Sequence, residues 1–231
     1  MQRRLLALFA PGDRVLELGC GTGEDAACLG RQGVRVLATD AAPGMAAAAR
    51  RKVAAAGLSH LVEVRRLAIE ELWLLGGEAG LAFDGAFSSF GGINCVRDPR
   101  GPARDLAALL RPGARLLLCI MGPLVPWEWG WFLLRGRPAE AFRRLRPGGV
   151  EWRGMAVQYP AIGAMKRAFA PEFRTRRVAA LGVFLPPSYA EPWAARHPRL
   201  LARLDRWERR WETLPPLPWL ADHYLLELER R

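Results

Sequence analysis

Val15-Leu16-Glu17-Leu18-Gly19-Cys20-Gly21-Thr22-Gly23 is the stretch that decides the fold of this 231-residue chain. Seventeen residues after Gly23, a second apolar run, 34–39, ends at Asp40. An apolar strand that leads into glycines lets a ligand approach the backbone, because glycine lacks a Cβ atom and tolerates positive φ. A carboxylate at the end of the neighbouring strand accepts hydrogen bonds from a ribose diol. Together the two segments predict a site for a nucleoside cofactor.

The spacing of the glycines separates two classes of nucleoside cofactor. A dinucleotide-binding loop has the pattern G-x-G-x-x-G, which needs glycine at position 24, where this chain has Glu24. The pattern present, E-x-G-x-G-x-G from Glu17 to Gly23, resembles motif I of the class I S-adenosylmethionine (SAM)-dependent methyltransferases. Further similarities follow in order: Asp40, Asp84 at the start of 83–88, and the turn Arg111-Pro112-Gly113 within 109–118. The resemblance covers residues 10–122 and the last predicted strand.

The resemblance implies a Rossmann-like α/β fold, SAM as the cofactor and methyl donor, and methyl transfer by SN2 displacement. It also assigns the cofactor contacts. The glycine loop would meet the methionine part of SAM, Glu17 its ammonium group and Asp40 its ribose, while the adenine and the sulfonium would meet residues further along. The full set is Glu17, Gly19, Cys20, Gly21, Thr22, Gly23, Asp40, Met45, Ile69, Glu70, Ser88 and Ser89. Ordinary structural roles are the alternatives: a helix cap for Asp40, core packing for Met45, and a surface position for Glu70.

Strand and helix signals alternate over the first 122 residues, which predicts βαβ units and a parallel sheet. The expected strands are 14–18, 34–39, 61–65, 83–88 and 114–121, and the expected helices are 24–32, 41–56 and 103–110. Tryptophan and proline become frequent after residue 122. We expect a single domain, 1–231, with a SAM-binding core at 10–122 and an inserted lid at 123–170 over the cofactor edge. Residues 171–231 would complete a seven-stranded, mostly parallel sheet with an antiparallel last strand, through strands 174–181 and 222–229 and a helix at 198–212.

Composition is that of an ordinary globular protein, with 51% hydrophobic and 25% charged residues. The four cysteines, Cys20, Cys28, Cys95 and Cys119, lack C-x-x-C spacing, which argues against a metal site or a disulfide framework. This usage fits a reduced chain, and no secretion signal is visible, so we expect a cytoplasmic protein with peripheral membrane contact as an option. The apolar run 116–134 is long enough to suggest a membrane span, but Gly122, Pro123 and Pro126 interrupt it.

The tryptophan-rich segment 127–134 is the main clue to the acceptor. Aromatic walls suit a flat or lipophilic molecule, so Trp127, Trp129 and Trp131 are predicted to bind the substrate together with Asn94 and Tyr159. A lid packed on the core is the plainer alternative, and a helix dipping into a membrane interface is another.

A general base is needed only where the nucleophile holds a proton of high pKa. The candidates are Asn94, Tyr159 and His223, and none of them is assigned from sequence. His60 is expected at the wrong edge of the sheet, and His197 is expected to start a helix. Tyr189, in the variable region, is a further candidate for orienting the substrate.

The net charge of +11 is concentrated in one part of the chain. Residues 1–130 hold 15 basic and 13 acidic groups, whereas residues 131–231 hold 19 and 10. A basic half attracts RNA, an anionic membrane or an acidic substrate. The leading prediction is a SAM-dependent methyltransferase of a small or lipophilic acceptor, such as a quinone-like ring or a natural-product intermediate. An RNA methyltransferase and a non-catalytic SAM-binding or membrane-surface protein are the alternatives. Nucleic acid is disfavoured because no appended binding module is visible, and the oligomeric state stays open.

Overall fold

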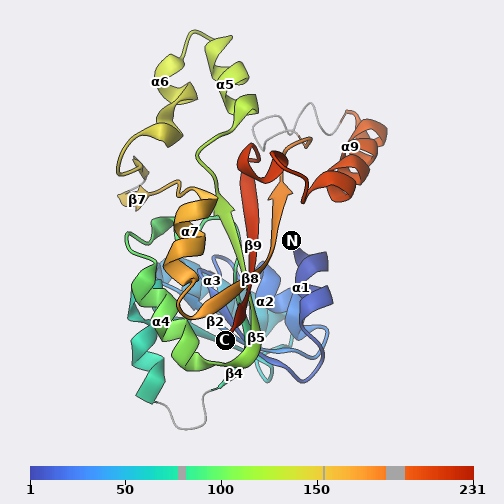
Figure 1. Ribbon diagram of the computed structural model, residues 1–231. Coiled ribbons are helices and arrows are strands. Elements are labelled where there is room, and N and C mark those ends of the chain that lie inside the picture. The colour runs from blue at the N-terminus through green and yellow to red at the C-terminus, as the bar shows by residue number, and fades with distance from the viewer. Residues whose placement is uncertain (78–81, 153, 186–195) are drawn as a thin grey trace.

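A seven-stranded sheet forms the centre of the molecule (Figure 1). The computed structural model describes residues 1–77, 82–152, 154–185 and 196–231. The strand order is β3-β2-β1-β4-β5-β9-β8. The first five strands in sequence are parallel, and β9 runs antiparallel to both β5 and β8. The strands are β1 Arg14–Leu18, β2 Arg35–Asp40, β3 Val62–Arg66, β4 Phe83–Ser88, β5 Leu110–Met121, β8 Phe173–Leu181 and β9 His223–Arg230. The predicted fold class is therefore confirmed.

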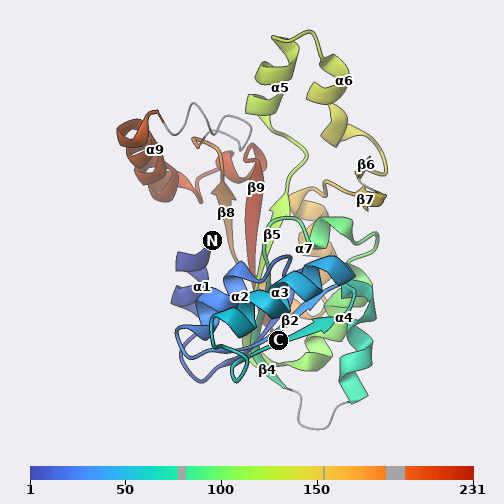
Figure 2. The same ribbon diagram turned by 180° about the vertical axis from the view of Figure 1, so that it is seen from behind.

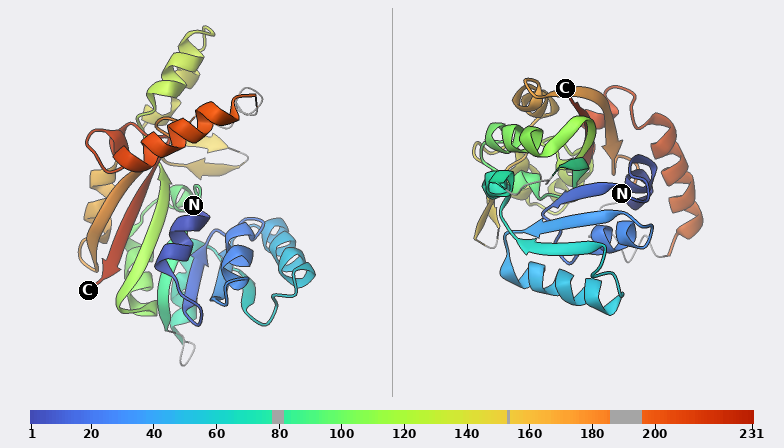
Figure 3. Two further views of the ribbon diagram at one scale, coloured as in Figure 1. Left: turned by 90° about the vertical axis from the view of Figure 1, so that its right-hand side faces the viewer. Right: turned by 90° about the horizontal axis from the view of Figure 1, so that it is seen from below.

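Helices cover both faces of the sheet (Figures 2 and 3). The first face carries α1 Gln2–Leu8, α2 Glu24–Gly30 and α3 Pro43–Ala55, and the second carries the 3₁₀ helix η1 Ile69–Gly77, α4 Arg100–Leu109 and α7 Ile162–Phe169. Side chains alternate between the faces along a strand. In β1, Val15 packs in the cluster of α1, α2 and α3, while Leu16 and Leu18 pack in that of η1, α4 and α7.

The remaining elements are mostly grouped beyond the carboxyl ends of the parallel strands. α5 Pro126–Leu133 and α6 Pro138–Ala141 stand away from the sheet, and α9 Pro198–Trp211 lies on the other side of the tips of β8 and β9 (Figure 1). We call residues 126–145 the α5–α6 arm. The smaller elements are η2 Ile93–Cys95, η3 Arg143–Leu145, the hairpin β6 Val150–Trp152 with β7 Met155–Val157, and η5 Leu217–Trp219.

The structure divides the region predicted as one inserted lid, 123–170, into three parts. The α5–α6 arm projects beyond the end of β5, clear of the helices α2 and α3 that flank the glycine loop (Figures 1 and 2). The β6–β7 hairpin follows the arm. The third part, α7, is a core helix, because Ile162, Met165 and Phe169 lie along one apolar face that packs into the sheet cluster.

Two other differences from the predicted elements concern the ends of the sheet. Helix α1 was not predicted, yet it buries Leu5, and Phe9 after it packs against Phe87 with ring centroids 6.1 Å apart. Strand β5 begins at Leu110 rather than at residue 114. No helix in the described part of the chain is long and apolar enough to cross a bilayer, and the apolar run 116–134 is divided between β5 and α5.

Candidate cofactor and active site

The glycine loop lies at the edge of the sheet where β1, β2 and β4 end. Hydrogen bonds fix it to the end of β2: the Cys20 N–H donates to the Thr39 carbonyl over 2.8 Å, and the Gly21 N–H donates to Asp40 Oδ2 over 2.8 Å. The other oxygen of Asp40 accepts from the Ala42 N–H at 2.9 Å. Asp40 is therefore part of the loop, and it does not cap α3, whose N-cap residue is Ala42.

Two glycines of the loop are required by close backbone approaches. Gly23 is the N-cap of α2 at φ +78°, and a Cβ atom there would lie 3.0 Å from Ala49 Cβ in α3. Gly19 has φ +68°, and its Cβ atom would lie 3.2 Å from Gly92 Cα in the segment that leaves β4. Side chains rarely adopt this left-handed conformation. The backbone of the glycine loop therefore packs directly against α3 and against the segment that follows β4. Backbone amide groups, rather than side chains, line this edge of the sheet.

A buried carboxyl group with no counter-charge lies directly beneath this loop. Glu17 is 2% exposed, and its Oε2 atom has no hydrogen-bond partner among the described residues. Burial raises the pKa of Glu17 well above its ordinary value, and the charges of Asp25 and Asp40 raise it further, while a hydrogen bond from the Ala26 N–H acts in the opposite direction. An unpartnered buried carboxylate is costly, so its presence calls for a cation. The ammonium group of SAM supplies one, and the residues present therefore fit this cofactor.

Sequence reasoning missed Asp25, which is buried in the first turn of α2. Its signal was the pair Glu24-Asp25 directly after the glycines, since acidic residues favour the start of a helix. Cys20 belongs to the same environment. Burial first, and then the charges of Glu17 and Asp40, raise the pKa of its thiol to about 12, so Cys20 is a neutral thiol. Thr22 is exposed at the tip of the loop.

The residues predicted to hold adenine occupy three different environments. Ile69 is buried in the core cluster, whereas Met45 and Glu70 are exposed. Burial raises the pKa of the Cys95 thiol, and the charges of Glu70 and Asp40 add to the effect. The charges of Glu70, in η1, and of Asp40, at the end of β2, thus both act on this thiol, and the adenine and ribose contacts stay predictions.

The segment after β4 contains a polar side chain that has a structural role. Asn94 is 0% exposed, and its Nδ2 atom donates to the carbonyls of Met121, over 3.1 Å, and Gln158, over 2.6 Å. Its Oδ1 atom accepts from the Met121 N–H at 3.0 Å. The amide therefore joins η2 to the end of β5 and to the segment after β7. Because both polar atoms of the side chain are bonded within the chain, the structure shows a structural role for Asn94, and its contact with the substrate or role as a base stays a prediction.

The two serines at the end of β4 differ. Ser88 is buried, and its hydroxyl donates to the Leu18 carbonyl over 3.0 Å, so it ties β4 to β1. The Ser89 hydroxyl is also buried but has no hydrogen-bond partner among the residues described. Of the two, Ser89 retains a free hydroxyl beside the glycine loop.

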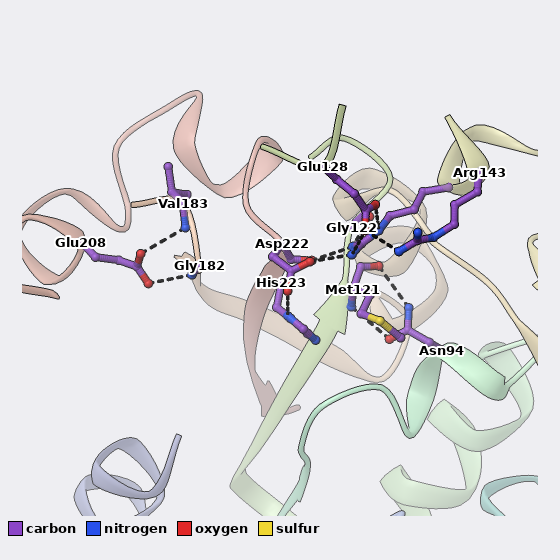
Figure 4. Close-up of polar contacts among 11 residues, drawn as sticks. Asn94, Met121, Gly122, Glu128, Arg143, Gly182, Val183, Glu208, Asp222 and His223 are labelled. Carbon is purple, nitrogen blue, oxygen red and sulfur yellow. Dashed lines mark hydrogen bonds and ion pairs between the residues drawn. The ribbon is translucent and has the colours of Figure 1, made fainter. Parts of the chain in front are cut away.

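A second group of charged residues lies at the end of β5 and the start of β9 (Figure 4). Asp222 Oδ2 is 2.9 Å from His223 Nδ1, and its Oδ1 atom accepts from Arg144 Nη2 over 2.6 Å. Arg144 Nε lies 2.8 Å from Oε2 of Glu128, a buried residue of the arm that also pairs with Arg143. Burial alone would raise the pKa of Asp222, but the hydrogen bonds and charges of His223 and Arg144 outweigh it and lower the pKa to about 2.

Tyr159 belongs to this second group. The Arg144 guanidinium lies over its ring, 5.1 Å from the centroid. The sequence offered weak signals for this group: Asp222 and His223 are adjacent, and Glu128 is the single charge in an apolar run.

The structure does not bring the predicted aromatic wall to the glycine loop. Trp129 packs on Phe142 within the arm, with centroids 5.8 Å apart, and Trp131 stacks under Arg135, whose Cζ atom is 3.4 Å from the ring centroid. Trp127 donates its Nε1–H to the Val183 carbonyl over 2.8 Å. Trp127 and Trp131 line an open apolar groove on the arm itself. The arm therefore presents its aromatic groups away from the cofactor edge.

The other candidates lie away from the loop or outside the described part of the chain. His60 lines a polar pocket with Arg14 and Arg35, at the amino ends of the strands, as predicted. His197 is the N-cap of α9. Tyr189 lies outside the described residues.

Comparisons with known proteins agree with this geometry. Residues 15–113 match the family model of a methyltransferase domain. The chain is 35% identical over 139 residues to a ubiquinone biosynthesis O-methyltransferase of Xylella fastidiosa (strain 9a5c), which covers 60% of this chain and 52% of that protein. It is 32% identical over 110 residues to a demethylmenaquinone methyltransferase of Clavibacter sepedonicus, covering 47% of this chain and 41% of that protein. The chain thus spans about half the length of these relatives.

A solved structure extends the similarity to the whole fold. The SAM-dependent methyltransferase from Mesorhizobium loti superposes with a TM-score of 0.63 at 19% identity, covering 99% of this chain and 95% of that one. At this identity the likeness shows the fold alone. The strand order, the loop with its unpartnered carboxylate and the matched domain lead to one family. The chain contains a methyltransferase domain at residues 15–113, and it has the fold of the class I, Rossmann-like, SAM-dependent methyltransferases.

Proposed function

We propose that this protein transfers the methyl group of SAM to a hydroxyl group of a small lipophilic acceptor, with a quinone-like phenol as the leading class. The choice of SAM as the methyl donor rests on the buried, unpartnered carboxylate of Glu17 next to the glycine loop. The choice of acceptor is supported by the relatives. The names of both refer to quinones, ubiquinone and demethylmenaquinone, and the name of the first specifies methyl transfer to oxygen.

Each residue of the donor site has a physical task. Glu17 would hold the ammonium group, and Asp40, fixed by the Gly21 and Ala42 N–H groups, would hold the ribose hydroxyls with its remaining lone pairs. When bound, SAM supplies an electrophilic methyl group on a positive sulfonium. The negative cluster of Glu17, Asp25 and Asp40 favours the positive donor over the demethylated product, which lacks the sulfonium charge. Alignment of the nucleophile and exclusion of water are the main contributions that methyl transfer needs from the protein.

The basic part of the chain does not by itself favour RNA. Many of its arginines are paired with carboxylates, among them Arg144 with Glu128 and Asp222, and Arg176 with Glu229. Pairing reduces the charge available to phosphates, which dominate nucleic-acid affinity. RNA is therefore the alternative acceptor that the experiment below must distinguish from a phenol.

The test measures donor binding and acceptor preference separately. Calorimetry with SAM should show binding, and methyl-labelled SAM should label a prenylated hydroxyquinol more efficiently than the same ring without the prenyl chain. Bulk tRNA and a reaction without acceptor serve as controls. Absence of SAM binding would refute the donor assignment. Label on tRNA alone, or SAM binding with no labelled phenol, would refute the proposed acceptor class.

A further inference from the structure

His223 lies at the carboxyl end of β5, on the face of the sheet that carries α1 and α2. It is the first residue of β9, and it lies opposite Met121 in β5 and Leu181 in β8. The next residue, Tyr224, packs into the opposite cluster, whereas Leu225, two residues along, packs with the residues of α1 and α2. Because side chains alternate, His223 shares the face of Leu225.

The segment after β4 connects His223 to the cofactor loop. The imidazole stacks edge to face against Phe90, with ring centroids 5.6 Å apart. Two residues later, Gly92 packs against Gly19 of the glycine loop, where a Cβ atom would approach to 3.2 Å. Two residues of extended chain span about 7 Å at most. The imidazole is therefore next to the segment that contacts the methionine end of the donor site.

Asp222 fixes the orientation of this imidazole. Its carboxylate contacts His223 Nδ1 at 2.9 Å, and its carbonyl accepts from Gly122 N–H at 3.2 Å and from Arg144 Nη1 at 3.1 Å. A carboxylate on Nδ1 holds the proton there and leaves the Nε2 lone pair available. Within the described chain Nε2 has no hydrogen-bond partner, and Figure 4 shows the ring extending away from the Asp222 carboxylate.

We propose that His223 is the proton acceptor of the methyl transfer, with Asp222 as its positioning residue and Arg144 holding Asp222 in place. This inference rests on the proposed function, since a hydroxyl acceptor is what requires a base. The acceptor oxygen forms a bond to the methyl carbon as the bond from that carbon to the sulfonium sulfur breaks, and its electron pair passes to sulfur. The hydroxyl proton moves to Nε2 of His223, and the imidazolium then releases it to water.

A groove lies on this face of the sheet. It lies between α1 and α9 and reaches Leu181, the residue opposite His223 in β8. Its lining combines the apolar side chains of Ala7 and Leu185 with the charged side chains of Arg4 and Glu212. His223 itself keeps 16% of its side chain exposed.

Several ionisable groups surround His223. They are Asp222 on its own turn, Arg144 behind Asp222, and Cys119 of β5, with Arg4 and the amino-terminal end of α1 beyond that thiol. Burial first raises the pKa of Cys119, to about 12, so this thiol stays neutral. A general base must be free of its proton before it can accept one, so the rate should rise with pH and then level off.

The experiment compares two phenols of the same size, one of low pKa that is ionised in the assay and one of high pKa that is not. His223→Gln should lower kcat for the high-pKa phenol by about 100-fold or more and change the low-pKa phenol little, because only the former needs a base. The pH step in the rate should disappear. Asp222→Asn should lower kcat about tenfold or more with KM unchanged, since the imidazole would lose its orientation. His60→Gln, at the opposite edge of the sheet, is the matched control.

SAM binding by calorimetry and the thermal midpoint, measured for each variant, separate chemistry from folding. Equal losses on both phenols with SAM binding intact would overturn the inference, because they indicate a structural role. Full activity of both variants on the high-pKa phenol would overturn it as well, while the proposed function would stand. A wild-type protein that binds no SAM or methylates no phenol would refute the proposed function, and this inference with it.

Discussion

Replacing Glu17 by glutamine should stabilise the protein without ligand and weaken its affinity for SAM. Glutamine keeps the shape of the side chain and removes the charge. The Glu17 carboxylate is 2% exposed and has an unpartnered oxygen within the described chain, and Asp25 and Asp40 add to its unfavourable environment. The amide of glutamine stays unpartnered, but an unsatisfied buried group costs more when it is charged, and we take the relief as about 1–3 kcal/mol. At about 2–4 °C per kcal/mol for a chain of this size, the thermal midpoint should rise by about 2–12 °C.

The change in affinity has the opposite sign. A hydrogen bond to a charged partner contributes about 1.5–3 kcal/mol, so the loss of the carboxylate opposite an ammonium group should weaken SAM about 10- to 150-fold. Calorimetry gives the affinity for SAM. Thermal melts without SAM show the change in stability, and melts with SAM show the loss of stabilisation by the cofactor. Glu24→Gln is the matched control, because it is the same chemical change on a side chain that is 67% exposed in the same segment.

The pH dependence of stability provides an independent check. The folded-state pKa of Glu17 is raised above its unfolded value, so the folded state binds this proton more tightly. Glu17 therefore contributes its full stabilisation of the folded state below its unfolded-state pKa, about 4.3, and this contribution is lost as pH rises through its folded-state pKa. Glu17→Gln should remove that loss. A lower midpoint for the variant, or unchanged SAM affinity, would refute the assignment of an uncompensated carboxylate that binds the ammonium group.

Three further predictions address single contacts. Asp40→Ala should weaken SAM by about tenfold or more in calorimetry, through loss of charged hydrogen bonds, and unchanged affinity would contradict the ribose assignment. Gly23→Ala should lower the thermal midpoint more than Gly57→Ala. Both glycines are in the left-handed conformation, where a side chain costs about 1–2 kcal/mol, but only at Gly23 would the new Cβ atom crowd Ala49, which adds about 1–3 kcal/mol of overpacking. Equal shifts of the midpoint would exclude that contact. Glu208→Gln should reduce the free energy of unfolding by about 1–3 kcal/mol in denaturant titration, because its carboxylate accepts the Gly182 N–H at 2.7 Å and the Val183 N–H at 3.1 Å. The exposed Glu151→Gln is its control, and an equal effect there would contradict this role.

The cofactor half of the fold was predictable because its signals are local. A strand that ends in Gly19, Gly21 and Gly23 needs positive φ at each glycine, and those conformations are seen. Strands β1 and β4 have the predicted bounds, since apolar runs bounded by turn residues specify them. Asp25 was missed because its burial depends on how α2 packs, and a sequence pattern does not show that.

The second half depends on contacts between distant residues. Arg144 meets Asp222 across 78 positions, and Asn94 meets Gln158 across 64. Such pairings follow from strand order, which places β9 between β5 and β8. Helix α7 was assigned to the insertion because its apolar face resembles that of any surface helix, and only its partner α4 shows that it belongs to the core. The tryptophan content indicated an aromatic surface, but the direction in which that surface faces depends on how the α5–α6 arm packs on the rest of the chain.

Two carboxylates at the same edge of the sheet, one buried and one partly buried, have pKa values shifted in opposite directions. Glu17, at the end of β1, lacks a counter-charge, and burial raises its pKa, whereas Asp222, before β9, has Arg144 and His223 as partners, and its pKa is about 2. Environments that push the pKa values of neighbouring groups apart distinguish their roles. The first carboxylate can gain a partner only from a ligand, and that ligand must be cationic. The second already has its partners within the chain, so it serves to hold an imidazole rather than to bind. On the proposed mechanism, the edge is therefore divided into a side that takes up a positive donor and a side that keeps a base in position, which is the division that methyl transfer to a hydroxyl group requires.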